Sequence, residues 1–497
     1  MPYASAQTAT AFGIETLPVS VEVDLRPGLP QFRIIGLPDK QIDESRERVK
    51  SAIKNSGLQF PNGRLTINLS PSDLPKSGTG FDLAIALAIL GAARGRPLLP
   101  VDCSAFGELG LDGKLFAFPR LTALLIGSHQ LVRGCAVPVS AGIIPVPGLH
   151  FLTAGSLREM VHRLERQEQF HTINCPPASQ TQLSAYRIDL IHGQNAAKRA
   201  LMIGLSGGHN MFLSGPPGAG KTMFAQAACE LLPDLNTQES LETFSLQSLV
   251  ARREQCLSLR PPIQAPHHTA SLQAVLGGGS ELVPGSLSLA HNGLLFLDEF
   301  PEFRRDVREA LRQPLQERCV RLLRTGRSCT LPADCLVIAA QNDCPCGLFG
   351  TARCICSMAE LVHYQKKLSQ PLLDRFSLFV EVPQVKASEM RPGVANQIGA
   401  KMAEQIARVR NQQKSRQAGK LNGRISVAEL HSALPAFSEL RILLQKAQAA
   451  YGLSARGMQS VLSVSKTIAD LAGESQILIE HVQEALQYRR RIFMDSS

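Results

Sequence analysis

Apolar and polar residues alternate over two short segments near the start of the chain, at 18–25 and 65–69. Such alternation is typical of strands that bury one face. Residues 39–55 repeat with a helical period, and residues 81–93 are almost entirely apolar. We therefore expect an amphipathic helix and a second, buried helix, which together with the strands predict a mixed α/β region.

The middle of the chain carries short continuous apolar runs at 211–213, 294–297 and 335–340. Runs of this length bounded by polar residues favour buried strands. A helix-compatible segment follows the first of them, at 223–232. Strands that alternate with helices predict a parallel sheet that is covered on both faces.

The last part of the chain shows helical periodicity with almost no strand pattern, so we expect a helical lid. Its expected helices lie at 397–414, 427–434, 439–451, 457–471 and 480–492. The predicted domains are 1–165, 186–385 and 386–497, with a linker at 166–185.

Composition narrows the class of protein. The chain has 497 residues, 44% hydrophobic and 19% charged, as in ordinary soluble proteins. The net charge of +10 favours an anionic partner. No signal-peptide pattern opens the chain, and the longest apolar run, 83–92, is too short to cross a bilayer. We expect a cytoplasmic protein without a membrane partner, whose twelve cysteines are thiols or metal ligands.

A glycine-rich stretch after the 211–213 run fits the phosphate-binding pattern G-x-x-x-x-G-K-[ST]. Such a loop turns its backbone N–H groups inward, and the helix that follows adds positive potential at the phosphates. The predicted nucleotide contacts are Gly215, Pro216, Pro217, Gly218, Ala219, Gly220, Lys221, Thr222 and Met223. Lys221 would reach the β- and γ-phosphates, and Thr222 would bind Mg²⁺. The alternative is a plain glycine-rich turn before a helix.

Two acids close the 294–297 run. Asp298 would hold Mg²⁺, and Glu299 would polarise the attacking water. Asn342 follows the 335–340 run and could orient that water, or could simply occupy a turn. Phosphoryl transfer also needs positive charge at the γ-phosphate, for which Arg375 and Arg456 are candidates, although either could be an ordinary ion-pair residue.

With these residues in view, the chain resembles the magnesium-chelatase-like family of AAA+ ATPases. The motifs that carry the resemblance include Gly193-Gln194, Ala265-Pro266-His267-His268-Thr269, Leu311-Arg312-Gln313-Pro314-Leu315, Cys344-Pro345-Cys346-Gly347 and Leu453-Ser454-Ala455-Arg456. The resemblance implies an α/β fold: an AAA+ parallel-sheet ATPase core with a C-terminal helical lid, preceded by a Lon-protease-like α+β domain.

The family also implies roles for single residues. It assigns Asn342 as sensor 1, Arg375 as the finger that reaches the next subunit's nucleotide, and Arg456 as the lid sensor. It implies ATP and Mg²⁺ as cofactors and a homo-hexameric ring. For this branch of the family it further implies a DNA helicase that drives branch migration in recombination during natural transformation.

Two other functions stay open. One is the ATPase motor of a magnesium-chelatase-type metal-insertion complex, which has a similar core but lacks the Lon-like segment. The other is a scaffold that binds nucleotide without turnover, against which the presence of Glu299 argues.

DNA contacts are expected from two insertions that the family places in the core, at 265–293 and 319–330. The second fits a hairpin and is rich in arginine, which would grip phosphates without reading sequence. The predicted DNA residues are Arg321, Arg324, Arg327, His267 and His268. The alternative is a solvated basic surface.

In the Lon-like segment, alignment of the Lys76-Ser77-Gly78 stretch places Gly80 where Lon carries its nucleophile, and 116–123 lacks the partner lysine. Proteolysis is therefore not expected.

Four cysteines cluster in one short loop, which suffices for tetrahedral Zn²⁺. They are Cys344, Cys346, Cys354 and Cys356. The C-x-C spacing is tighter than that of most zinc sites, so thiols packed without metal are the alternative.

Overall fold

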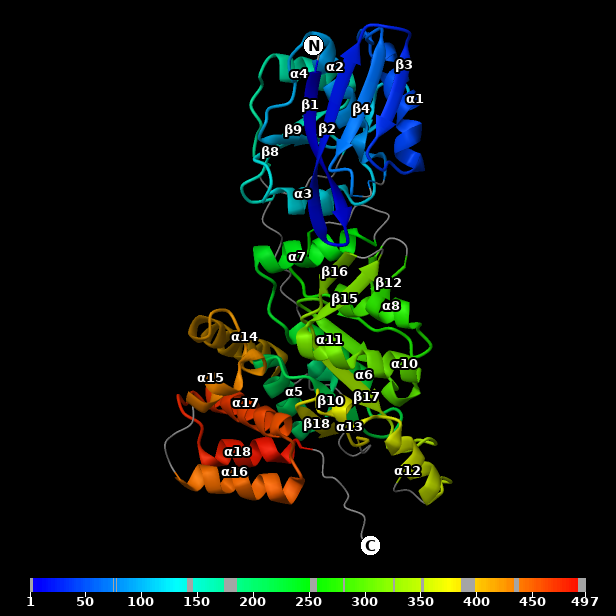
Figure 1. Cartoon of the computed structure of the whole chain (residues 1–497). Helices are drawn as coiled ribbons and strands as arrows, with labels where there is room; N and C mark the ends of the chain where they lie inside the picture. The colour runs from blue at the N-terminus through cyan, green and yellow to red at the C-terminus, as the bar shows by residue number, and fades with distance from the viewer. Residues whose placement is uncertain are drawn as a thin grey trace.

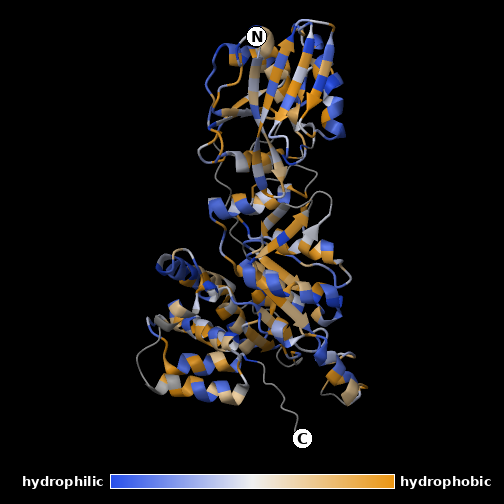
Figure 2. Ribbon diagram, viewed as in Figure 1, coloured by the Kyte–Doolittle hydropathy of each residue, from blue (hydrophilic) through white to orange (hydrophobic). Residues whose placement is uncertain are grey.

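The computed structural model describes residues 3–74, 76, 78–140, 146–173, 186–250, 257–279, 282–324, 327–349, 353–385, 398–432 and 438–489. The molecule is elongated: an N-terminal sheet lies at one end, a parallel sheet in the middle, and the C-terminal helices pack to one side (Figure 1). Apolar residues concentrate on the strands of both sheets (Figure 2).

The N-terminal region is built on a seven-stranded mixed sheet of order β3-β4-β2-β1-β5-β8-β9. Its strands are β1 (Tyr3–Phe12), β2 (Glu15–Arg26), β3 (Gln31–Ile35), β4 (Arg64–Ser70), β5 (Cys103–Ala105), β8 (Gly134–Pro138) and β9 (His150–Ala154). The short strands β6 (Glu108–Leu109) and β7 (Leu115–Phe116) form a separate ladder. The strands expected at 18–25 and 65–69 are confirmed.

The helices of this region are α1 (Lys40–Asn55), α2 (Asp82–Arg94), α3 (Leu121–Ser128) and α4 (Leu157–Glu165). The Asp39 side chain caps α1 by accepting from the Ile42 N–H at 2.9 Å. Helix α2 is buried from Asp82 to Ala92, as its apolar sequence predicts. The buried Asp82 carboxylate is paired with Arg48 at 2.9 Å, which satisfies the charge inside the core.

The central sheet has the order β11-β14-β17-β10-β18, and all of its pairs are parallel. Its strands are β10 (Met211–Ser214), β11 (Ile263–Gln264), β14 (Leu294–Leu297), β17 (Leu336–Gln341) and β18 (Leu378–Glu381). The helices around it are α5 (Asn195–Gly207), α6 (Lys221–Leu231), α7 (Thr237–Ser248), α10 (Arg305–Ala310), α11 (Arg312–Glu317), α12 (Met358–Lys366) and α13 (Gln370–Leu373). Because the strands are parallel, the segments that follow β10, β14 and β17 leave the sheet at the same edge.

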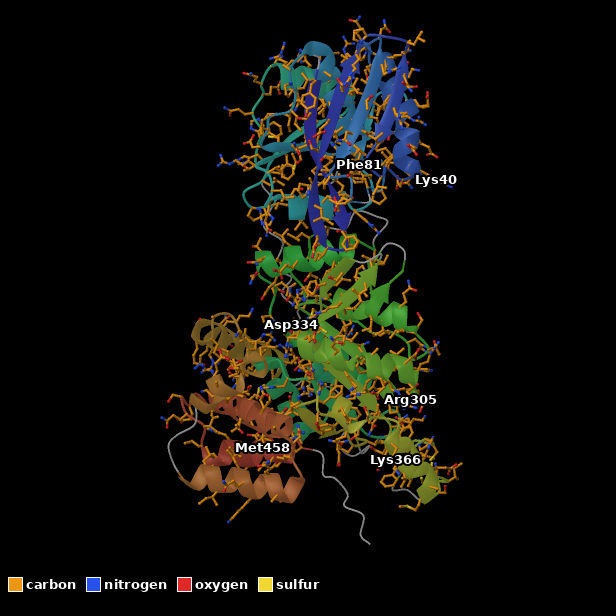
Figure 3. The ribbon with its side chains drawn as sticks, viewed as in Figure 1. Lys40, Phe81, Arg305, Asp334, Lys366 and Met458 are labelled. Carbon is orange, nitrogen blue, oxygen red and sulfur yellow. The ribbon has the colours of Figure 1, made fainter. Side chains whose placement is uncertain are left out.

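Both expected insertions have structure of their own. The first contains α8 (Leu272–Leu276), the short strand pair β12 (Gly277–Gly278) and β13 (Val283–Pro284), and α9 (Ser286–Leu289). The second is an antiparallel hairpin of β15 (Cys319–Arg324) and β16 (Arg327–Pro332), as the sequence predicts. Asp334, which is labelled in Figure 3, follows the hairpin. It accepts from Arg318 at 2.8 Å and pairs with Arg424 at 2.9 Å.

The C-terminal region is helical. It comprises α14 (Ile398–Arg416), α15 (Val427–Ser432), α16 (Ser438–Tyr451), α17 (Ala455–Ala472) and α18 (Ile479–Gln487). The helix expected at 480–492 ends at Gln487, and residues from 490 onward lie outside the described part. The chain is thus a mixed α/β protein with a parallel sheet and a helical C-terminal region.

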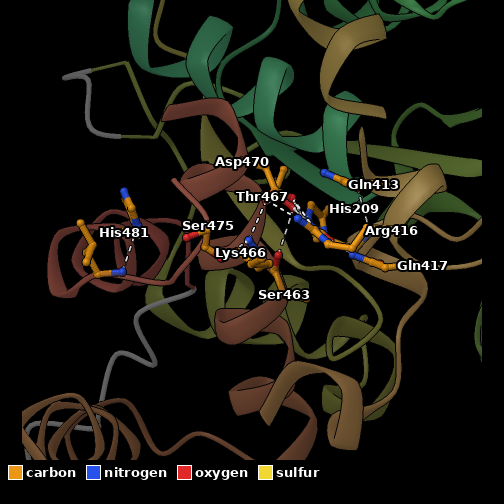
Figure 4. A network of polar contacts seen from close by, with 12 residues as sticks. His209, Gln413, Arg416, Gln417, Ser463, Lys466, Thr467, Asp470, Ser475 and His481 are labelled. Carbon is orange, nitrogen blue, oxygen red and sulfur yellow. Dashed lines mark hydrogen bonds and ion pairs between the residues drawn. The ribbon is translucent and has the colours of Figure 1, made fainter. Parts of the chain in front are cut away.

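A buried polar network ties this helical region to the central sheet (Figure 4). Asp470 of α17 accepts hydrogen bonds from Arg416 at 2.9 Å and from Lys466 at 2.8 Å. In the same helix, the Thr467 hydroxyl lies 2.8 Å from His209 Nε2, at the end of α5. Because Asp470, Lys466, Thr467 and His209 are buried, these groups depend on their partners, and the network holds α17 in one position.

The N-terminal and central regions are in contact. The turn between β1 and β2 packs against the hairpin: a Cβ on Gly13 would lie 2.0 Å from Cys329 Sγ. Ile126 of α3 packs against Leu241 and Phe244 of α7. Across the described ranges, no helix has both the length and the apolar character needed to cross a bilayer.

Candidate nucleotide-binding site

The glycine-rich loop lies between β10 and α6, which is the strand–loop–helix arrangement that its pattern requires. Gly218 and Gly220 have φ angles of +75° and +91°, where other residues are disfavoured. A Cβ on Gly215 would lie 2.2 Å from the carbonyl oxygen of Val382, so only glycine fits there. The loop therefore has the backbone form of a phosphate cradle at the N-terminus of α6.

Lys221 points back into this loop. Its Nζ donates to the carbonyl oxygens of Gly215 at 2.7 Å and Pro216 at 3.0 Å, and to Asn342 Oδ1 at 3.0 Å. Burial lowers the pKa of Lys221, and the nearby Asp298 opposes that shift. Asn342 follows β17, the neighbour of β10, so the sheet order brings the expected sensor beside the expected lysine.

A second pair meets where Mg²⁺ would bind. The Thr222 hydroxyl donates to Asp298 Oδ2 at 3.1 Å, and the other carboxylate oxygen accepts from the Glu299 N–H at 2.9 Å. Hydroxyl and carboxylate oxygens are the ligands that Mg²⁺ prefers. The two side chains expected to bind Mg²⁺ thus lie together at the end of the phosphate loop.

Glu299 has an unusual backbone and an unexpected partner. Its φ is +48°, which is uncommon for a residue with a side chain and is often found at functional sites. Oε2 of Glu299 lies 3.1 Å from Nδ1 of His268, in the first insertion. His268 also stacks on His267, with ring centroids 4.1 Å apart. Of the two histidines predicted to contact DNA, His268 therefore lies against the acid expected to activate water.

Arg375 lies at the opposite edge of the sheet from the phosphate loop. It precedes β18, and the backbone N–H of Ser377 donates to the carbonyl oxygen of Asn210 at 2.9 Å, just before β10 begins. The four residues of β10 separate this edge from the loop by about 13 Å. Arg375 therefore lies on a different surface of the subunit from Lys221.

Arg456 lies beside Arg375. Both guanidinium groups donate to the same amide oxygen, Gln316 Oε1, each at 2.8 Å. Burial lowers the pKa of Arg375, and the adjacent positive charge of Arg456 adds to that shift. Together with Arg318 they line a polar cavity of about 290 Å³. The structure thus divides the expected ATPase residues into two groups, one at each edge of the sheet.

Three residues near these groups were not predicted from the sequence. Gln316 joins the two arginines, Gln194 donates to the carbonyl oxygens of Ala219 at 3.0 Å and Pro383 at 2.7 Å, and Tyr364 hydrogen-bonds the backbone of Asn342. Only Gln194 carried a signal, because it belongs to a family motif.

The four clustered cysteines converge in space. Cys344 Sγ lies 3.4 Å from Cys346 Sγ and 3.9 Å from Cys354 Sγ, and the last two are 3.7 Å apart. All four ligand atoms, that of Cys356 included, lie within 4.8 Å of one another, so the group could hold a metal ion. The backbone N–H of Leu348 hydrogen-bonds Cys346 and lowers the pKa of its thiol to about 6.

The predicted DNA residues of the hairpin are only partly described. Arg321 is exposed and pairs with Glu317 of α11 at 3.2 Å. Arg324 and Arg327 face each other across the end of the hairpin ladder, and their side chains lie outside the described part. The hairpin therefore presents arginine positions at its tip.

The position expected to align with the Lon nucleophile lies against the ring of Phe118. A Cβ on Gly80 would lie 2.3 Å from the ring of Phe118. A side chain at this position would therefore require the Phe118 ring to move.

The fold and the site define a P-loop ATPase of the AAA+ class. A family model described as magnesium chelatase, subunit ChlI, matches residues 188–390; related models match 21–140, described as subunit ChlI of Mg-chelatase, and 397–489, the ChlI C-terminal region. A Salmonella typhimurium protein named YifB is 37% identical over 507 residues, covering 98% of this chain and 97% of the relative.

The competence protein ComM of Haemophilus influenzae is also 37% identical, over 503 residues that cover 99% of this chain and 98% of the relative. The chain therefore belongs to the YifB/ComM family of magnesium-chelatase-like AAA+ ATPases. A weaker match, 22% identical over 223 residues, covers 42% of this chain and 28% of the DNA replication licensing factor mcm5 of Xenopus tropicalis.

Proposed function

We propose that this protein is an ATP-driven motor that works on DNA as a ring of identical subunits. The observation that carries the proposal is the division of the ATPase residues between two edges of the central sheet. Lys221 and Asp298 lie at one edge, and Arg375 and Arg456 lie at the other. Neither group is a complete phosphoryl-transfer site, because one lacks cationic fingers and the other lacks a phosphate cradle.

A head-to-tail contact between copies would bring the two groups together. Such a contact uses two different surfaces of each subunit, and it forms a closed ring when the rotation between copies closes. The family implies six subunits. In this arrangement Arg375 and Arg456 would both serve the neighbour's nucleotide, so the lid sensor acts across the interface rather than within its own subunit.

The proposed division of labour follows the contacts. Lys221 would release its carbonyl partners to hold the β- and γ-phosphates, while Thr222 and Asp298 would hold Mg²⁺. Glu299 would accept a proton from the attacking water, which Asn342 would orient. ATP supplies the phosphoanhydride bond whose cleavage drives the motor. ATP and Mg²⁺ are the proposed cofactors, and Zn²⁺ is proposed for the cysteine cluster.

Three observations support DNA as the substrate on which the motor acts. The net charge of +10 favours a polyanion. The β15–β16 hairpin carries arginine positions at its end, where phosphate contacts would not depend on sequence. One relative is named a competence protein, and a weaker match is named a DNA replication licensing factor. We therefore propose branch migration or helicase action in the recombination of incoming strands.

The N-terminal region is proposed to be a Lon-protease-like domain that does not cleave peptides. Gly80 supports this, because glycine supplies no nucleophile at the position where the alignment places that of Lon. Its contact with the hairpin through Gly13 and Cys329 suits a structural or partner-binding role.

ATPase assays with purified protein test the proposal. Forked or single-stranded DNA should raise the rate of ATP hydrolysis. Between 50 and 200 mM salt the affinity for DNA should fall roughly by orders of magnitude, and the stimulation should fall steeply with it. A metal-insertion motor would show no DNA stimulation, and a scaffold would show no turnover. Either result would contradict the proposal.

A further inference from the structure

We propose that the four-cysteine cluster binds one Zn²⁺ ion through four thiolates, and that the metal-bound loop holds Asn342 in place beside Lys221. The ligands are Cys344, Cys346, Cys354 and Cys356. The zinc site is inferred from the geometry of the cluster alone. Its effect on ATP hydrolysis rests on the function proposed above.

The sulfur positions match a single tetrahedral ion. A Zn–S bond of about 2.3 Å in tetrahedral geometry places sulfurs about 3.8 Å apart. The three separations among the sulfurs of Cys344, Cys346 and Cys354 are 3.4, 3.9 and 3.7 Å. The agreement holds although the ligands come from two segments that are separated by a loop.

Other uses of four cysteines fit this geometry less well. A disulfide requires sulfurs about 2.05 Å apart, and all four residues are free thiols. An iron–sulfur cluster places several irons and sulfides between its cysteines, which needs a wider cage. A single ion with four sulfur ligands is left, and tetrahedral S₄ coordination is typical of zinc.

Backbone donors already surround the site. The N–H groups of Leu348 and Ile355 hydrogen-bond Cys346. Such N–H···S contacts are the usual outer shell of thiolate sites, where they offset the excess negative charge of four thiolates on one dication.

In the described part of the loop, two apolar side chains are largely exposed: Ile355 at 87% and Phe349 at 55%. Of the four ligands, only Cys344 is buried. Exposed apolar side chains add little to the stability of the loop, so metal ligation would supplement its backbone hydrogen bonds and its packing on Pro217.

The same loop is connected to the proposed ATPase site in three ways. Cys344 follows Asn342 by two residues, directly after β17. A Cβ on Gly347 would lie 2.5 Å from the Pro217 ring, so the loop packs on the phosphate loop. Cys356 leads into α12, whose Tyr364 hydrogen-bonds the backbone of Asn342. Fixing the loop therefore fixes the sensor from both sides.

The metal can be measured directly on the full-length protein. Elemental analysis of the purified protein should give one zinc per chain, and X-ray absorption should show four sulfurs at about 2.3 Å. The double variant Cys346→Ser/Cys354→Ser should lose the zinc. Cys103→Ser, which removes a thiol in β5 of the N-terminal sheet, is the matched control and should keep it. Wild-type protein without zinc, or with iron in its place, would overturn the site.

The coupling to ATP hydrolysis needs a separate readout. In the double variant, kcat should fall by about ten- to a hundredfold, because a misplaced sensor costs rate. The Kd for ATP should change little, since Lys221 and the glycines remain. An unchanged kcat in zinc-free protein would contradict the effect of zinc on ATP hydrolysis, but it would not contradict zinc binding itself. Zinc-loaded wild-type protein without any ATPase activity would instead contradict the proposed function.

A second measurement does not depend on the variant folding. Thiol modification of wild-type protein in the presence of a colorimetric chelator should release one zinc per chain, and ATPase activity should fall in parallel with release. Release of zinc with no loss of activity would again overturn the coupling.

Discussion

Nδ1 of His268 lies 3.1 Å from Oε2 of Glu299. The histidine belongs to the first insertion of the core, and the glutamate follows β14, where it is expected to activate water. Held in this way, the carboxylate has one oxygen engaged by a side chain. The contact therefore links an insertion expected to lie near DNA to the acid expected to drive hydrolysis.

Replacing His268 should change how ATP hydrolysis depends on DNA. In His268→Ala the Glu299 carboxylate loses its partner, so we expect a DNA-free ATPase rate several-fold above wild type and a smaller stimulation by DNA. Steady-state ATPase assays with and without forked DNA measure both. His267→Ala is the control, because His267 contacts Thr269 at 2.8 Å instead of the carboxylate. Equal behaviour of the two variants would contradict this role of His268.

Binding and hydrolysis should separate between two variants of the phosphate site. Lys221→Ala removes the cation expected at the β- and γ-phosphates, so ATP affinity should fall by about a hundredfold or more. Glu299→Gln keeps the shape but removes the base, so ATP should bind normally while kcat falls by about two to four orders of magnitude. Equilibrium binding of labelled ATP and single-turnover hydrolysis distinguish the two. Near-normal turnover in either variant would argue against the assignment.

Gln316 should act as a positioning residue for the two arginines. Both guanidiniums share its Oε1 at 2.8 Å, so Gln316→Leu leaves two like charges side by side without a common acceptor. We expect kcat to fall by about tenfold with little change in ATP affinity, since the phosphate loop is untouched. Gln313→Leu, on the same short helix, is the matched control because Gln313 pairs with Glu317. A loss of ATP affinity equal to the loss of kcat would contradict a role in positioning.

Stability should fall at acid pH because of His209. Burial lowers the pKa of this histidine from 6.5 to about 3, so the folded chain keeps it neutral while the unfolded chain protonates it below about pH 6.5. The free energy of unfolding should therefore drop as the pH falls below 6.5, by about 2 kcal/mol at pH 5. Denaturant melts of His209→Gln should show a shallower pH dependence than wild type. An identical slope in the variant would mean that other groups carry the effect.

The parts of the site that directly follow a strand could be predicted from the sequence, because a local pattern determines where they lie. The phosphate loop, Asp298 and Asn342 each follow an apolar run, and parallel strands bring such positions to one edge. The contacts of His268 and Gln316 could not be predicted. They join segments whose meeting depends on how an insertion and a short helix fold.

Strand β1 and the cysteine cluster show the same limit of prediction from the sequence. Strand β1 alternates small residues such as alanine, serine and threonine, so its periodic signal is weak although it pairs with β2 along its whole length. The cysteine spacing allows either zinc or packed thiols, and the structure adds that the four sulfurs lie within 4.8 Å of one another, close enough to share one ion.

The central claim is that one ATPase site is shared by two subunits, and complementation tests it most directly. Lys221→Ala and Arg375→Ala should each be inactive alone. Mixed one to one, they should regain activity, since roughly a quarter of the interfaces would combine an intact Lys221 with an intact Arg375. Lys221→Ala mixed with Glu299→Gln is the control and should stay inactive, because both changes damage the same half. A Lys221→Ala and Arg375→Ala mixture as inactive as its components would contradict the shared site.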